Sequence, residues 1–184
     1  MSEAISAERV NYADVIRTVP NYPIEGVMFR DITTLLSHPG GFRQSIDDLV
    51  EPHLSSPPDV IAALDARGFI FGGAMADRLG SRLVPLRKEG KLPHDTHQIA
   101  YELEYGDAVL EMHADAVETG DRVMIVDDLL ATGGTAEAAT KLIRKAGGVI
   151  IEAAFVIDLP DLGGAKLLEY LGVPVRALVA FEGG

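Results

Sequence analysis

The chain has 184 residues, of which 47% are hydrophobic, and this length and composition suit one compact domain with a sizeable core. Its 16 basic and 28 acidic residues give a formal net charge of -12, which argues against binding to nucleic acid. The absence of cysteine excludes disulfides, cysteine zinc sites and thiol chemistry.

The N-terminal residues give no sign of a signal peptide. The first ten, MSEAISAERV, carry early charges and lack an apolar stretch, and no apolar run in the chain is long enough to cross a bilayer. We therefore expect a cytoplasmic protein that does not bind membranes. A helix is predicted over residues 6–18, followed by a segment rich in loops over residues 20–36.

From residue 40 onwards, helical and strand patterns alternate. Short apolar runs have the pattern of strands covered on both faces, and between them apolar residues recur at helical spacing. This alternation predicts an α/β fold, with a mainly parallel twisted sheet flanked by helices, in one domain over residues 1–184. The predicted helices are 40–54, 69–79, 135–146 and 161–171, and the predicted strands are 59–64, 82–87, 122–127, 149–158 and 174–181, with a loop at 88–97 and a hairpin at 101–112 that turns at 105–107.

The first candidate site in chain order is the turn DARG, residues 65–68. The run VIAAL before it is typical of a strand and FIFGG after it of a helix, so the turn lies where α/β proteins bind ligands. A helix start offers free backbone N–H groups to an anion. Arg67 is therefore a candidate anion ligand, and the alternative is that it pairs with Asp65.

A second candidate is the basic run in PLRKEGKLP. Arg87, Lys88 and Lys91 are three of the sixteen basic residues, and they follow the apolar strand RLVP. An acidic protein that binds an anion must gather positive charge locally, although the alternative is a solvated basic loop. His94 and His97 follow, but two histidines without a further ligand are weak evidence for a metal site, and we interpret them as loop residues.

The third candidate is VMIVDDLLATGGT, residues 123–135. An apolar strand ends on Asp127 and Asp128, DDLLATGG forms a loop, and a helix follows. Ionised carboxylates only accept hydrogen bonds, so the two donors of a sugar diol suit them, while small residues let a phosphate approach backbone N–H groups. The stretch predicts a sugar phosphate site, and its alternative is a solvated acidic turn. The residues predicted to hold the phosphate are Ala131, Thr132, Gly133, Gly134 and Thr135.

The stretch VMIVDDLLATGGT closely resembles the phosphoribosyl-pyrophosphate motif of type I phosphoribosyltransferases. YPIEGVMFRDITTLL, LDARGFIFG, LRKEGKLP and YELEYG resemble further segments of that family in the same order, so the resemblance covers about residues 22–161. It implies that family's fold, with a base-pocket and hood segment at 22–36, a mobile loop and hairpin at 88–112, and assembly as a homodimer. The family often has glycine after KLP, where this chain has His94.

The resemblance also implies roles for the phosphate-side residues. It makes residues 65–68 the pyrophosphate loop and Arg67 a catalytic contact to the leaving group. It assigns Arg87, Lys88 and Lys91 to pyrophosphate, with Arg87 reaching the neighbouring subunit's site. The pyrophosphate loop consists of Asp65, Ala66, Arg67 and Gly68.

For the base, the resemblance makes Glu104 the catalytic acidic residue near the imidazole edge and Tyr105 the aromatic residue of the hood over the site. By itself, Glu104 would be interpreted as a solvated turn residue. One wall of the pocket is expected on the segment GVMFRD, with Leu159 closing the other side, and ordinary core packing is the alternative for these apolar residues. The residues expected on the first wall are Val27, Met28, Phe29 and Arg30.

The implied activity is transfer of a 5-phosphoribosyl group from phosphoribosyl pyrophosphate to adenine, a purine salvage reaction that gives AMP and pyrophosphate. Mg²⁺ is the expected cofactor, held mainly by the substrate and without a direct protein ligand. Two alternatives remain. One is transfer to hypoxanthine, guanine, xanthine or orotate, because only the base-pocket segments discriminate. The other is a non-catalytic sensor of phosphoribosyl pyrophosphate, which would usually need a nucleic-acid-binding surface or an appended domain.

Overall fold

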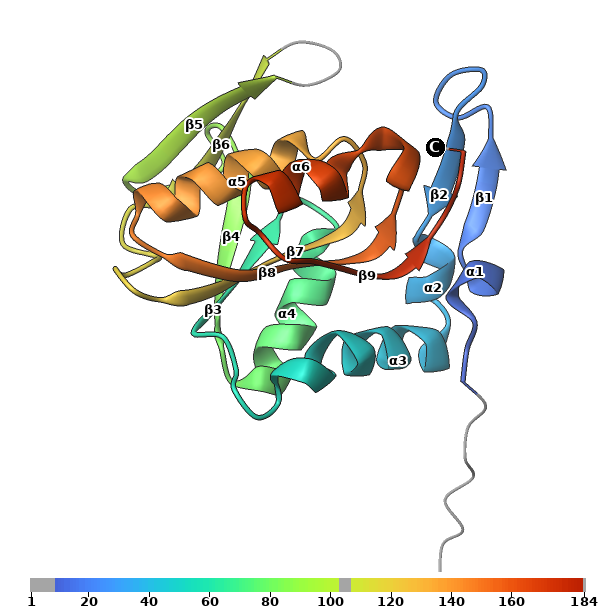
Figure 1. Ribbon diagram of the computed structural model, residues 1–184, viewed down its shortest axis with the longest axis horizontal. Helices are drawn as coiled ribbons and strands as arrows, with labels where there is room; N and C mark the ends of the chain where they lie inside the picture. Colours follow the sequence, from blue (N-terminus) through green and yellow to red (C-terminus); the bar gives the residue numbers. More distant parts are fainter. Residues whose placement is uncertain (1–8, 103–106, 184) are drawn as a thin grey trace, which may run out of the picture.

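A seven-stranded sheet forms the centre of the protein, seen in a computed structural model that describes residues 9–102 and 107–183 (Figure 1). Its strand order is β5-β6-β4-β3-β7-β8-β9. Strands β4, β3, β7, β8 and β9 run parallel to one another. The hairpin of β5 and β6 pairs antiparallel with the end of β4. The predicted α/β fold with a mainly parallel sheet is thus confirmed. The strands are β3 (Val60–Leu64), β4 (Arg82–Lys88), β5 (Thr96–Glu102), β6 (Asp107–His113), β7 (Arg122–Leu130), β8 (Val149–Asp158) and β9 (Val175–Ala180).

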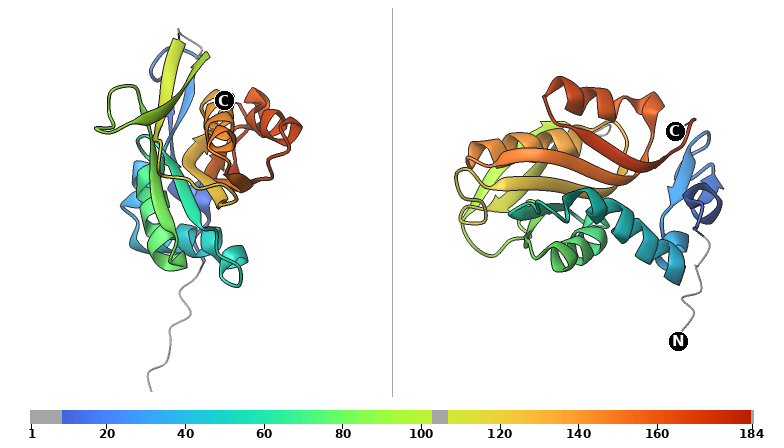
Figure 2. Two further views of the ribbon diagram at one scale, coloured as in Figure 1. Left: turned by 90° about the vertical axis from the view of Figure 1, so that its left-hand side faces the viewer. Right: turned by 60° about the horizontal axis from the view of Figure 1, so that its bottom comes forward.

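Helices cover both faces of this sheet, as the right-hand view of Figure 2 shows. On one face lie α5 (Gly134–Lys145) and α6 (Gly164–Tyr170), and on the other lie α3 (Pro39–Val50) and α4 (Gly68–Leu79). Strand β7 has the continuous apolar run of a strand buried on both faces. Its residues Val123 and Ile125 pack into the core on the α5 side, whereas Met124 and Val126 pack into the core on the α4 side.

The N-terminal part forms a small two-stranded sheet beside the end of β9 (Figure 1). Strand β1 (Arg17–Pro20) pairs antiparallel with β2 (Met28–Asp31), and the short helices α1 (Tyr12–Val15) and α2 (Thr33–Leu36) flank the pair. The β1–β2 pair and the β5–β6 hairpin both point upward in Figure 1, on either side of the sheet. They frame the edge where the central strands end.

The helix predicted over residues 6–18 is confirmed only over α1, and its predicted end is wrong because β1 begins at Arg17. The segment 20–36 is also more regular than predicted, since it contains β2 and α2. Pairing with β2 decides the conformation of β1, and this partner lies ten residues away in the chain. Helical spacing of apolar residues cannot reveal such a partner.

The remaining predicted elements are confirmed, β8 with the predicted ends and the others with shifted ends. Strand β7 continues to Leu130, so DDLL is part of the strand and not of the loop, because Asp127, Leu129 and Leu130 pair with β8. The helix predicted over 40–54 gives way at Glu51 to the 3-10 turn η1 (Glu51–His53). Gly163, with φ of 79°, separates the 3-10 turn η2 (Pro160–Leu162) from α6.

The hairpin is longer than predicted, and residues 103–106, which include two of the three residues of the predicted turn, lie outside the described part. Strand β5 begins at Thr96, within the segment predicted as loop 88–97, and it pairs with β6 along its whole length. Strand β6 extends to His113, one residue past the predicted end. Within residues 9–102 and 107–183, no helix combines the length and apolar character needed to cross a membrane.

Candidate active site

The acidic pair lies near the carboxyl end of β7, and Arg67 reaches it from the turn between β3 and α4. The Arg67 Nε donates to Asp128 Oδ2 at 2.5 Å, and Asp128 is only 3% exposed. Asp127 Oδ1 accepts from the backbone N–H of Asp128 at 2.8 Å. The alternative pairing of Arg67 with Asp65 is not the one observed. The structure therefore joins two segments, DARG and DDLLATGGT, that are about sixty residues apart in the chain.

Burial and charge both act on Asp127. Its pKa is raised well above the ordinary range of a carboxyl, first because burial penalises the charged form and second because the neighbouring Asp128 repels it. A raised pKa makes protonation of this carboxyl easier, and a protonated carboxyl can donate a hydrogen bond as well as accept one. The binding of a ribose diol by Asp127 and Asp128 stays a prediction.

We expect Asp127→Asn to be more stable than the wild type at neutral pH and to lose activity. A carboxyl whose pKa is raised by folding destabilises the folded state as pH rises from its unfolded pKa, near 4, through its folded pKa. The neutral amide avoids this penalty, so Tm should rise by about 2–4 °C at pH 7.5, which is what roughly 1 kcal/mol is worth in a domain of this size. Thermal melts of Asp127→Asn and the wild type at pH 7.5 and pH 4 test this prediction, because the Tm difference between them should be smaller at pH 4. Equal Tm values at pH 7.5 would contradict it.

Gly68 allows the predicted pyrophosphate turn, residues 65–68, to approach the acidic pair. A Cβ at this position would lie 2.7 Å from the carbonyl oxygen of Val126 and 2.9 Å from Asp127 Oδ1. The first turn of α4 can therefore pack against the end of β7 only without a side chain there. On the other side, the backbone N–H of Asp65 donates to the carbonyl of Leu86 at 3.0 Å. The peptide bond between Asp65 and Ala66 is cis.

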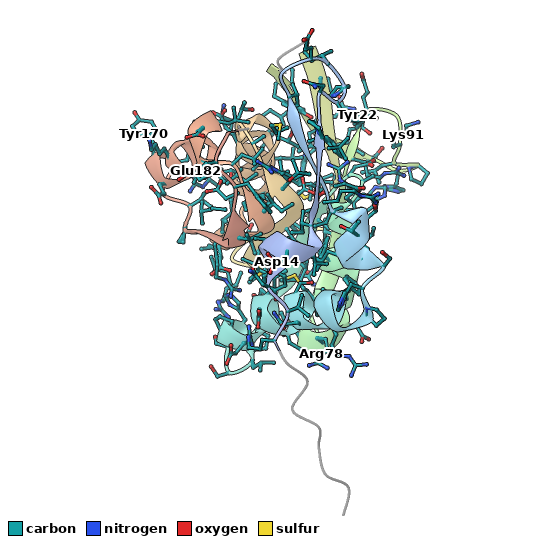
Figure 3. All side chains as sticks on the ribbon, turned by 90° about the vertical axis from the view of Figure 1, so that its right-hand side faces the viewer. Asp14, Tyr22, Arg78, Lys91, Tyr170 and Glu182 are labelled. Atoms are coloured by element: carbon teal, nitrogen blue, oxygen red, sulfur yellow. The ribbon has the colours of Figure 1, made fainter. Side chains whose placement is uncertain are left out.

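The basic run after β4 joins the same edge through Arg87. Its Nε donates to Asp65 Oδ2 at 3.0 Å, and its guanidinium carbon lies 5.8 Å from the ring centre of Phe69. The side chains of Lys88 and Lys91 are exposed, and Figure 3 shows Lys91 at the outer rim of the molecule. Arg87 thus contacts the predicted pyrophosphate turn directly, whereas the two lysines flank it.

The predicted phosphate loop is short, and it packs against the start of α6. Gly133 has φ of 87° and directly precedes α5. The backbone N–H of Gly164 donates to the carbonyl of Ala131 at 3.1 Å, and a Cβ on Gly164 would lie only 2.3 Å from that oxygen. Gly164 was not predicted from the sequence. The adjacent glycines Gly163 and Gly164, which lie shortly after the predicted base contact Leu159, were a visible signal.

We expect Gly164→Ala to push the phosphate loop out of place. The new methyl group would overlap the backbone carbonyl oxygen of Ala131, and a backbone atom cannot move aside as a flexible side chain can. The KM for phosphoribosyl pyrophosphate should rise about tenfold or more, with a smaller change in the KM for adenine. Steady-state kinetics measure both. Gly40→Ala is the matched control, because its Cβ would lie 3.5 Å from the nearest atom, and equal kinetics of the two variants would contradict this role.

The predicted base-pocket residues lie on the β1–β2 pair and at the end of β8. Phe29 packs edge-on against Tyr22, with ring centres 5.1 Å apart. Arg30 donates to the carbonyl of Glu182 at 2.9 Å and lies over the ring of Phe181, so it ties β2 to the C-terminal segment. The backbone N–H of Phe181 in turn donates to the carbonyl of Asp158, the residue before Leu159.

The ordinary-core alternative fits some of these residues and not others. Leu159 is 7% exposed and belongs to the core on the α4 side. Met28 is 37% exposed, and Val27 and Phe29 are only partly buried, so the residues on the other wall are not core residues. Glu104 and Tyr105 lie outside the described residues.

A cavity of about 490 Å³ opens between β5, the phosphate loop and α5. Tyr101 lines it from the hairpin, Thr132 and Gly134 from the loop, and Lys141 from α5. The hairpin therefore overhangs the predicted phosphate site. His94 packs near His113, with ring centres 6.2 Å apart, and the described residues contain no group of three or more His, Cys, Asp or Glu side chains that could hold a metal.

Comparison with known proteins places the chain in a family. Residues 32–169 match the phosphoribosyl transferase domain. The adenine phosphoribosyltransferase of Brucella anthropi is 57% identical over 178 residues, which are 97% of this chain and 98% of that protein. A second relative, from Brucella suis, has the same name, identity and coverage.

Solved structures agree in fold. The adenine phosphoribosyltransferase of Rhodothermus marinus superposes with a TM-score of 0.86 at 46% identity, covering 92% of this chain and 96% of that one. The adenine phosphoribosyltransferase of Saccharomyces cerevisiae was solved with adenine and D-2,5-dideoxy-2,5-imino-altritol 1,6-bisphosphate. It superposes with a TM-score of 0.84 at 37% identity, covering 91% of this chain and 96% of that one. The chain therefore belongs to the phosphoribosyltransferase family, and within it to the adenine phosphoribosyltransferases.

Proposed function

We propose that the protein transfers the 5-phosphoribosyl group of phosphoribosyl pyrophosphate to adenine, a purine salvage reaction. The bond between adenine N9 and C1′ forms, the bond between C1′ and the pyrophosphate oxygen breaks, and N9 loses its proton. The contact between Arg67 and Asp128 carries this proposal, because it puts a cation for the pyrophosphate beside a carboxylate for the ribose.

Charge separation in the transition state suits this arrangement. Negative charge builds on the leaving pyrophosphate, where Arg67 and the basic residues Arg87, Lys88 and Lys91 would stabilise it. Positive charge builds on the ribose ring, which the acidic pair on β7 would favour. Because preorganised charges cost no reorganisation during the reaction, the fixed Arg67–Asp128 contact is an advantage over mobile side chains.

The 5′-phosphate of the substrate would bind in the loop from Ala131 to Thr135. The loop ends at the start of α5, where free backbone N–H groups and the helix dipole favour an anion. Thr132 is exposed and lines the cavity beneath β5, so its hydroxyl is available to donate. Water must be kept from the ribose cation, and the overhanging hairpin is placed to exclude it.

Magnesium is part of the proposal and, when bound, neutralises negative charge on the pyrophosphate. Asp128 is already bonded to Arg67, and the raised pKa of Asp127 weakens this carboxyl as a metal ligand. Oxygen atoms of the substrate therefore suit the ion better than these two side chains do. We propose that the substrate holds Mg²⁺ without a direct protein ligand.

For the base, we propose that adenine lies between the segment from Val27 to Arg30 and Leu159, with Glu104 near its imidazole edge and Tyr105 above the site. Arg30 ties the β1–β2 pair to the C-terminal segment, and the backbone N–H of Phe181 in that segment donates to the carbonyl of Asp158 at the end of β8, which supports a pocket between them. The yeast relative was solved with adenine, and this supports adenine as the base here.

A direct assay tests the function against its two alternatives. The protein is incubated with phosphoribosyl pyrophosphate, Mg²⁺ and each nucleobase in turn, and nucleotide formation is measured. We expect the highest kcat/KM with adenine. A higher value with hypoxanthine, guanine, xanthine or orotate would assign another base. Tight binding of phosphoribosyl pyrophosphate without turnover of any base would instead favour the sensor.

We further propose a cytoplasmic homodimer that binds neither nucleic acid nor membranes. The net charge of -12 supports the absence of nucleic-acid binding. Ile70 on α4 and Leu83 on β4 are 43% and 42% exposed, and such exposed large apolar side chains favour an interface between subunits. The side chain of Arg87 is 34% exposed beside Asp65, which leaves it accessible to a neighbouring subunit's site. Light scattering after size-exclusion chromatography measures the assembly.

A further inference from the structure

Glu111 on β6 is a buried carboxylate outside the site described above. Glu111 and Asp128 are the least exposed carboxylate residues in the part of the chain that the structure describes, each 3% exposed. Asp128 is held by Arg67. Because a buried charge is costly without partners, the contacts of Glu111 need an explanation of their own.

Both oxygens of Glu111 accept hydrogen bonds. Oε2 accepts from the backbone N–H of Gly90 at 3.0 Å, and Oε1 accepts from Gln98 Nε2 at 2.6 Å. Glu111 pairs across the sheet with Arg87 on β4 and with Gln98 on β5, so the three side chains share one face. Glu111 therefore bonds the basic turn after β4 to the β5–β6 hairpin.

The turn that Glu111 holds is the one that carries the basic residues. The backbone N–H of Lys91 donates to the carbonyl of Lys88 at 3.3 Å, and Gly90 has φ of 73°. From the other side, Arg87 donates to the carbonyl of Lys91 at 3.3 Å and to Asp65 at 3.0 Å. A continuous set of hydrogen bonds thus runs from Glu111 through this turn to the predicted pyrophosphate turn.

We propose that Glu111 is a positioning residue for the leaving pyrophosphate. Its negative charge would repel an anion, so its contribution must be geometric: it fixes the turn that presents Lys88 and Lys91, and through the turn it supports Arg87 against Asp65. This proposal rests on the proposed function, because it takes these cations as pyrophosphate ligands. A hydrogen bond to a charged group is strong enough to hold such a turn.

The substitution series separates geometry from charge. Glu111→Met removes both hydrogen bonds, and Glu111→Asp keeps the charge but is too short to reach both donors. Glu111→Gln removes the charge while keeping an acceptor for Gly90, since the amide of Gln98 can turn to accept from the new amide. Gln98→Met removes the bond to Glu111 Oε1, together with the bond from Gln98 to Thr96 Oγ1, and leaves the bond from Gly90 to Glu111.

Glu152 on β8 provides a matched control for the loss of a partly buried carboxylate. It accepts from Arg176 Nε at 3.0 Å and contacts His53 Nε2 at 3.3 Å. Neither of these partners belongs to the proposed site. Glu152→Met should therefore lower Tm without changing the affinity for pyrophosphate.

The test is calorimetric binding of magnesium pyrophosphate to each variant, together with the KM values for both substrates and Tm. We expect Glu111→Met and Glu111→Asp to raise the Kd of magnesium pyrophosphate and the KM for phosphoribosyl pyrophosphate about tenfold, with the KM for adenine unchanged. Glu111→Gln and Gln98→Met should stay within about threefold of the wild type.

Two results would overturn the proposal. In one, Glu111→Met and Glu111→Asp lower Tm as Glu152→Met does but bind magnesium pyrophosphate as the wild type does. In the other, Glu111→Gln is impaired as strongly as Glu111→Met, so that the charge and not the held turn matters. If Glu111→Met does not fold, Glu111→Asp decides. Failure of the wild type to bind magnesium pyrophosphate would instead refute the proposed function.

Discussion

Replacing Glu104 by leucine should reduce kcat with adenine by about a hundredfold to ten-thousandfold, the range typical of general acid–base assistance. When N9 becomes attached to the ribose, electron density shifts around the imidazole ring of the base. A carboxyl group near N7 stabilises that change by hydrogen bonding, and leucine cannot. Steady-state kinetics measure the loss. Glu104→Gln keeps a hydrogen-bonding group and should lose less.

Binding and folding should survive the same change. The sequence predicts that Glu104 lies just before the turn of the hairpin, and a substitution at a solvated turn residue usually changes stability by no more than about 0.5 kcal/mol, so Tm and the affinity for phosphoribosyl pyrophosphate should stay near the wild-type values. Glu169→Leu is the matched control, because this glutamate is exposed on α6. If Glu104→Leu turns over at the wild-type rate, the residue is a solvated turn glutamate and the catalytic assignment is lost.

Replacing Arg67 by alanine should reduce kcat/KM for phosphoribosyl pyrophosphate by about a hundredfold to a thousandfold, the usual effect of removing one donor to a developing negative charge. The affinity for pyrophosphate should fall with it. Stability should also decrease by about 1–3 kcal/mol, because Asp128 is left buried without its partner. The lower end is expected, since the side chain of Arg67 is 53% exposed and water can enter.

Two further variants separate the two effects of Arg67. In Arg67→Ala/Asp128→Asn the buried charge is gone, so stability should recover while activity does not. Arg78→Ala is the control on the same helix: Arg78 pairs with Asp47 in an exposed ion pair, and Figure 3 shows it far from the upper edge of the molecule. Tight binding of pyrophosphate by Arg67→Ala would mean that the pyrophosphate subsite lies elsewhere.

The sequence was sufficient to place the two central segments of the candidate site. Each follows a short apolar run that is buried in the structure, β3 for DARG and β7 for DDLLATGGT. These two strands are parallel neighbours, so their carboxyl ends must meet at one edge. The pairing partner of Arg67 could not be predicted, because Asp65 and Asp128 both lie at this edge, where Arg87 bonds Asp65 and Arg67 bonds Asp128.

Other parts of the site depend on partners that are distant in the chain. Strand β1 exists because it pairs with β2, and β7 extends past the acidic pair because β8 lies alongside. Gly164 supports the phosphate loop through an approach to Ala131 over more than thirty residues of chain. Local patterns carry no information about such contacts, and this explains why the ends of elements were less well predicted than their existence.

The tie between Arg30 and the C-terminal segment has a practical consequence for anyone who prepares this protein. Arg30 binds the carbonyl of Glu182, and the backbone N–H of Gly183 donates to Asp161 at 2.8 Å, so the last residues are anchored beside the β1–β2 pair (Figure 1). An affinity tag that follows closely after Gly183 would therefore begin next to the proposed adenine pocket. Kinetic constants for adenine should therefore be measured on protein whose C-terminus carries no tag.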